Sequence, residues 1–183
     1  MVVERNKMDF NALVSTIRQV HKHLAARASR AVNISLTFRN WLIGAYIAEF
    51  ELNGEDRAKY GDNLLQDLAN HLKELKVSNS NRRQLYDYLK FYRTYPQIRR
   101  TVSAQLQSYV PEYIAKSKKK MPTVSAQLLI PSEQLIDNLS YSKFKLLVDL
   151  DDETKRTFYE IECMRGNWSV RELNRQIGSL YFE

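Results

Sequence analysis

Residues 64–96 read LLQDLANHLKELKVSNSNRRQLYDYLKFYRTYP, and this stretch decides the fold class expected for the 183-residue chain. Leucines at helical spacing predict one helix through its first part, and a polar break follows at 77–80. A second helix is predicted from about Asn81 to Tyr95, because proline disfavours helix at the residue before it. Two helices with so short a break between them indicate a helix–turn–helix, although many helical hairpins share the pattern.

Helices are also expected outside this stretch. Apolar residues at steps of three and four predict two long helices over 1–54, with a break near Asn33. Ser140, Asp151-Asp152 and Ser169 are predicted to begin three further helices, the last through a capping box with Glu172. We therefore expect an all-α fold, a helical bundle with a central helix–turn–helix-like unit and a C-terminal three-helix unit.

The chain divides into four segments that we interpret as one compact module. Residues 1–54 form the long helical pair, a candidate for dimerisation, and 55–110 form the helix–turn–helix-like unit. Residues 111–131 contain a run of lysines and two prolines, and we interpret them as a basic linker or loop with a candidate strand at 124–130. Residues 132–183 form the C-terminal helical unit.

Composition limits the classes of function. No run of about 18 apolar residues exists, so we expect no membrane-spanning helix. The single cysteine, Cys163, has no partner for a disulfide within the chain, which favours a cytoplasmic setting. No Cys/His cluster has zinc-ligand spacing, and the five glycines are scattered rather than gathered in a phosphate-binding loop. We therefore expect no catalytic residue, no metal site and no cofactor.

The net charge of +7 is unevenly distributed along the chain. Between Lys76 and Lys120 there are eleven basic and two acidic residues, a net charge of +9 that leaves −2 for all other residues. A basic bias confined to one quarter of a chain is typical of a contact surface for polyanions.

The helix over 81–95 is the main candidate for that contact surface. The face turned away from its apolar residues carries Arg, Lys, Asn and Tyr, which pair with phosphates and read base edges. A solvated basic face is the alternative interpretation. The final helix carries a smaller basic set, for which surface charge on a packing helix is the alternative. The candidate DNA-binding residues are Asn79, Asn81, Arg82, Arg83, Tyr86, Lys90, Arg93, Arg99, Arg100, Lys118, Lys119, Arg171 and Arg175.

Several motifs resemble the N-terminal domain of the YhcG family. They are Ile43-Gly44 with Glu49-Phe50-Glu51, Arg57-Ala58-x-Tyr60-Gly61-x-x-Leu64-Leu65, the aromatic run before Pro96, Leu139-Ser-Tyr-Ser, and Asn167-Trp-Ser-Val-Arg-Glu-Leu-Asn-Arg-Gln-Ile177. The resemblance implies a bacterial, helix–turn–helix-like domain with a DNA-targeting role. In this family a C-terminal PD-(D/E)xK nuclease domain usually follows, so we expect the chain to be the N-terminal part of a longer protein.

Two functions of different classes remain open at this point. The first is a DNA-binding domain, with double-stranded DNA as the expected partner and no nuclease activity of its own. The second is an interaction module, in which the helices between Phe10 and Leu52 form a homodimer or dock another protein.

Overall fold

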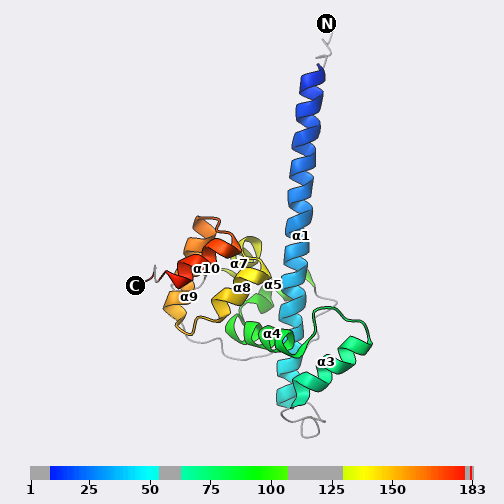
Figure 1. The fold of residues 1–183 in the computed structure, drawn as a ribbon, viewed down its shortest axis with the longest axis vertical. Coiled ribbons are helices and arrows are strands. Elements are labelled where there is room, and N and C mark those ends of the chain that lie inside the picture. The colour runs from blue at the N-terminus through cyan, green and yellow to red at the C-terminus, as the bar shows by residue number, and fades with distance from the viewer. Residues whose placement is uncertain (1–8, 54–62, 107–129, 180–181, 183) are drawn as a thin grey trace.

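The computed structural model describes residues 9–53, 63–106, 130–179 and 182. These residues contain helices and no strand, which confirms the all-α class (Figure 1). The candidate strand at 124–130 lies outside the described residues except for Ile130, as does most of the segment 111–131. The helices are α1 (Phe10–Asn53), α3 (Leu64–Glu74), α4 (Arg82–Thr94), α5 (Ile98–Gln105), α7 (Ser132–Asn138), α8 (Tyr141–Val148), α9 (Glu153–Arg165) and α10 (Val170–Gly178).

The first helix is one element of 44 residues, so the predicted break near Asn33, and with it the predicted helical pair, is wrong. An asparagine inside a helix costs less than about 0.7 kcal/mol relative to alanine, which is too little to end a long helix. The carbonyl of Asn33 accepts a hydrogen bond from the Thr37 hydroxyl one turn later, at 2.8 Å. At its start, Asp9 caps the helix by accepting a hydrogen bond from the N–H of Ala12.

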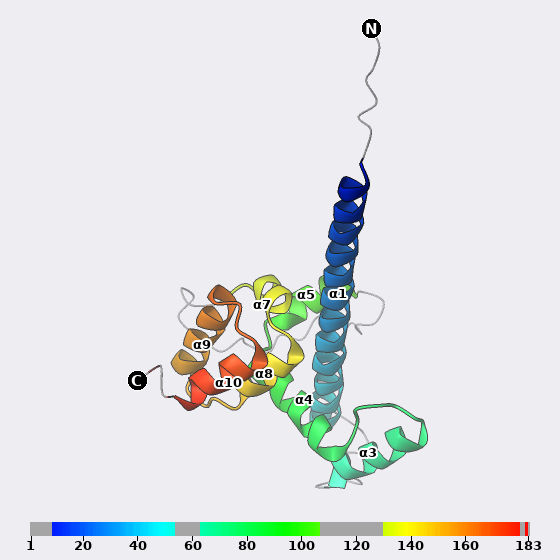
Figure 2. The ribbon, with the colours of Figure 1, turned by 45° about the horizontal axis from the view of Figure 1, so that its top comes forward.

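The second half of α1 forms the core together with α4, which also packs against α3 and α8 (Figures 1 and 2). Trp41 is fully buried, and its indole N–H donates a hydrogen bond to the Tyr95 carbonyl at 2.9 Å. Gly44 lets the two helices approach closely, because a Cβ at this position would lie 2.1 Å from the carbonyl oxygen of Tyr88. The position of α4 is therefore set by its crossing with α1.

The three helices predicted for the C-terminal unit are present as α8, α9 and α10, and α7 precedes them. The predicted capping box exists, since the Ser169 N–H donates to the Glu172 carboxylate at 2.6 Å and the Glu172 N–H donates to the Ser169 hydroxyl. Neither α5 nor α7 was predicted, because each has only two turns and too few apolar residues to show a period. They pack against each other, with the Thr101 hydroxyl donating to the Ser132 hydroxyl at 2.8 Å.

The first half of α1 projects from this helical body (Figures 1 and 2). Every residue from Asp9 to Asn33 is exposed, whereas Phe38, Trp41 and Leu42 are buried. Within the described part of the chain, no helix is both long enough and apolar enough to cross a membrane.

Candidate nucleic-acid interface

The turn between α3 and α4 is fixed by contacts to both α1 and α4. Lys76 and Asn79 adopt positive φ values of 57° and 54°, a region that asparagine tolerates better than most residues. The guanidinium of Arg39, on α1, donates to the Ser78 carbonyl at 2.6 Å. The Tyr88 hydroxyl donates to the Asn79 carbonyl at 2.9 Å. The start of α4 is therefore held in one place relative to α1.

Helix α4 begins with a capping box that the sequence analysis did not identify. The Gln84 N–H donates to the Asn81 side-chain oxygen at 2.9 Å, and the Asn81 N–H donates to the Gln84 side-chain oxygen at 3.1 Å. Asn81 was predicted to lie near base edges, and its side-chain oxygen is already used by this cap. A helix N-terminus carries a partial positive charge that favours nearby anions.

A polar hollow of about 660 Å³ lies between α3 and the start of α4, and we call it the α3–α4 groove. It brings together four of the predicted residues, namely Asn79, Asn81, Arg82 and Arg83. Polar residues of α3 also line it, and the sequence analysis missed them. Their spacing of four and three was the available signal, because it puts them on the helix face opposite the leucines. These residues are Gln66, Asn70 and Lys73.

The arginines of the groove are free to meet an anion. Arg82 and Arg83 are exposed, and neither forms an ion pair with another residue that the structure describes. Tyr86, one turn further along α4, is 54% exposed. The acidic residue of this helix, Asp87, is paired with Lys145 of α8 at 2.8 Å. The first half of α4 thus presents exposed arginines, and the one carboxylate of this helix is paired with Lys145.

The second half of the predicted basic face is engaged within the molecule. The Lys90 ammonium lies 2.9 Å from the Asp149 carboxylate, at the end of α8. The Arg93 guanidinium lies 2.6 Å from the Glu51 carboxylate, near the end of α1. An anion that bound Lys90 or Arg93 would have to compete with these carboxylates.

The other predicted residues lie away from the groove. Arg99 is half-buried and Arg100 is exposed, both on α5. Arg171 and Arg175 are exposed on α10, which packs against α8 and α9. Lys118 and Lys119 lie outside the described residues.

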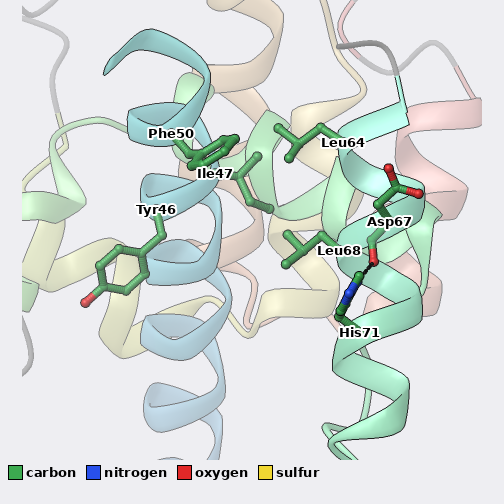
Figure 3. Close-up of a pocket in the computed structure, with 7 residues that line it drawn as sticks. All are labelled: Tyr46, Ile47, Phe50, Leu64, Asp67, Leu68 and His71. Carbon is green, nitrogen blue, oxygen red and sulfur yellow. Dashed lines mark hydrogen bonds between the residues drawn. The ribbon is translucent and has the colours of Figure 1, made fainter. Parts of the chain in front are cut away.

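A second hollow, of about 310 Å³, lies between α1 and the leucine face of α3 (Figure 3). Ile47, Leu64 and Leu68 point toward one another across it. His71 is the imidazole that lines this hollow, and its Nδ1 lies 2.8 Å from the Asp67 carbonyl oxygen of the same helix. Among the described residues, no group of three His, Cys, Asp or Glu side chains is placed to hold a metal ion. Most side chains that line this hollow are apolar and come from the packed faces of α1 and α3.

Comparisons with known proteins agree with the motifs. A family model described as "DUF1016 N-terminal domain" matches residues 16–183. The chain is 33% identical over 165 residues to "Putative nuclease YhcG" of Escherichia coli (strain K12). That alignment covers 84% of this chain and 40% of the relative, so the chain spans about two fifths of the length of the curated protein it matches. No solved structure matches the chain.

Proposed function

We propose that this chain, which belongs to the DUF1016 N-terminal domain family, binds double-stranded DNA and carries out no nuclease chemistry of its own. The observation that carries the proposal is the α3–α4 groove. Arg82 and Arg83 stand there exposed and without a carboxylate partner among the described residues, with Lys73 on the facing helix. Three cationic side chains around one hollow suit the phosphates of a duplex.

The packing of α4 determines how it would meet DNA. Leu85, Tyr88, Leu89 and Phe91 are buried, and α1, α3 and α8 pack around the helix. Its first turns carry the arginines that have no carboxylate partner among the described residues, whereas Lys90 and Arg93 further along are ion-paired, so we propose that α4 approaches the duplex with its N-terminal end leading. In helix–turn–helix proteins the N-terminal residues of the second helix contact base edges, and this arrangement would give Tyr86 and the Asn81 amide the same role.

The relative's printed name supports a role for this domain in a longer protein. The protein from Escherichia coli carries the name "Putative nuclease YhcG", and the alignment with this chain covers 40% of it. We propose that the domain holds such a nuclease on DNA in the cytoplasm, with the chemistry supplied by a separate C-terminal domain.

Fluorescence anisotropy with a labelled duplex at several salt concentrations tests the proposal. If about five phosphates are neutralised, the logarithm of the affinity should fall with the logarithm of salt at a slope of about −4.5. The double variant Arg82→Gln/Arg83→Gln should make that slope less steep by about 2, because each phosphate contact contributes about 1 to its magnitude. Circular dichroism should remain unchanged, since both side chains are exposed.

The matched control is Arg18→Gln/Lys22→Gln, which removes the same two charges from the exposed half of α1. We expect this variant to bind with the slope of the wild type. Equal losses in the two variants would mean that net charge alone drives binding, and no binding at low salt would exclude the DNA proposal.

A further inference from the structure

The projecting half of α1 is not covered by any other part of the chain that the structure describes. All residues from Asp9 to Asn33 are exposed, and the ion pair between Arg30 and Asp137 of α7, at 2.9 Å, marks where the helix leaves the body. Most helical stability in proteins comes from packing of an apolar face rather than from helix propensity. A projecting helix with an exposed apolar stripe would therefore be stabilised by packing that stripe against a partner.

The apolar residues of this half follow the spacing of a coiled coil. Phe10, Leu13, Ile17, Val20 and Leu24 are separated by three, four, three and four residues, which assigns them to alternating a and d positions of a heptad. Their exposed fractions run from 42% to 77%, so the whole stripe is open to solvent. The next position in the series is occupied by Arg27.

The residues beside the stripe decide which partner fits it. The flanking e and g positions between Phe10 and Leu24 hold Val14, Thr16, His21 and His23, with no Lys, Arg, Asp or Glu. Basic flanks would select an acidic helix, because e and g charges set partner choice in coiled coils. Flanks without formal charge leave no such preference and place no like charges across a pair of identical helices. This favours a second copy of the chain.

The position of Arg27 decides the direction of the pair. In a parallel pair the two Arg27 side chains would face each other in the seam, and like charges there are repulsive. In an antiparallel pair, the a and d residues match when Leu13 faces Leu24 and Ile17 faces Val20. Arg27 then faces the other copy's Phe10 and lies next to its Asp9. Since Asp9 is the acidic residue of this half of α1, the antiparallel direction pairs opposite charges.

We propose that residues 9–27 of α1 form an antiparallel two-stranded coiled coil with a second copy of this chain. The proposal does not depend on DNA binding, because its residues are separate from the α3–α4 groove.

Sedimentation equilibrium without DNA tests the dimer. The wild type should have twice the chain mass of 21.5 kDa, and the double variant Ile17→Glu/Leu24→Glu should have that mass once. The matched control Gln19→Glu/Ala26→Glu carries the same charges at the same spacing on the opposite face of the helix, and it should stay dimeric. A monomeric wild type, or a dimer in both variants, would overturn the proposal.

Disulfide crosslinking tests the direction without disrupting the helix. A mixture of Leu13→Cys and Leu24→Cys chains should form a disulfide-linked dimer, and neither chain alone should do so. Crosslinking of either variant with itself would refute the antiparallel pair. The native thiol adds little background, because Cys163 is buried.

Discussion

The carboxyl group of Glu160 offers a quantitative test of the core. This residue is 5% exposed, and its carboxylate accepts a hydrogen bond from the Tyr95 hydroxyl at 2.6 Å. Burial raises the pKa of Glu160 from 4.5 to about 7, because the apolar surroundings disfavour the charged form more than Tyr95 and Arg156 favour it. The folded protein therefore holds a proton on Glu160 at pH values where the unfolded chain has lost it.

The sign of the pH dependence follows from this difference. The protonated group stabilises the fold fully below about pH 4.5, and that stability is lost as the pH rises through about 7. A difference of about 2.5 in pKa corresponds to about 3 kcal/mol. Glu160→Gln keeps an oxygen that accepts from Tyr95 and removes the charge. We expect its free energy of unfolding to exceed that of the wild type by about 3 kcal/mol at pH 8 and by about 1 kcal/mol or less at pH 5.

Urea unfolding followed by circular dichroism at pH 5 and pH 8 measures both values. Glu74→Gln makes the same chemical change at an exposed carboxylate on α3, and it should shift stability by less than about 0.5 kcal/mol at either pH. An equal increase in the free energy of unfolding of Glu160→Gln at both pH values would refute the reasoning. An increase that is independent of pH cannot come from the removal of a buried charge.

Two further predictions concern the helix that bears the groove. Gly44→Ala should lower the free energy of unfolding by about 1–3 kcal/mol in urea, because the new Cβ must push α1 away from the Tyr88 carbonyl. Gly178→Ala, which meets nothing within 4 Å, should cause no loss. Lys90→Gln/Arg93→Gln should change the salt slope of DNA binding less than the Arg82/Arg83 variant does, because both side chains already have carboxylate partners. An equal effect in anisotropy would extend the interface along the whole of α4.

Local signals in the sequence were sufficient to predict most helices but not the continuity of α1. A capping box and a leucine period lie within a few residues of each other, so α10 and α3 were predictable. The break near Asn33 was predicted because the apolar period pauses there and resumes at Ile34. In the structure the helix continues through this pause: its apolar residues are exposed to solvent before it, and those after it pack into the core of the protein.

Some residues of the candidate site could likewise be predicted from the local sequence, and others could not. Arg82 and Arg83 follow a polar turn, and their place at the start of a helix could be inferred from neighbouring residues. The ion pairs of Lys90 and Arg93 join positions 59 and 42 residues apart, so no local pattern distinguishes these residues from the arginines of the groove. Lys73 was missed because α3 was interpreted through its leucines alone.

Helix α1 connects the two proposals, because its ends serve different surfaces. In the antiparallel pair the two Gly44 positions, where α1 crosses α4, are separated by 51 residues of helix, or about 75 Å at 1.5 Å per residue. That distance is about two turns of B-DNA, at about 34–36 Å per turn. A duplex of one turn can therefore fill a single groove only, whether or not the chain is a dimer. Anisotropy with such a short duplex isolates Arg82 and Arg83, and sedimentation without DNA isolates residues 9–27, so each proposal can fail while the other stands.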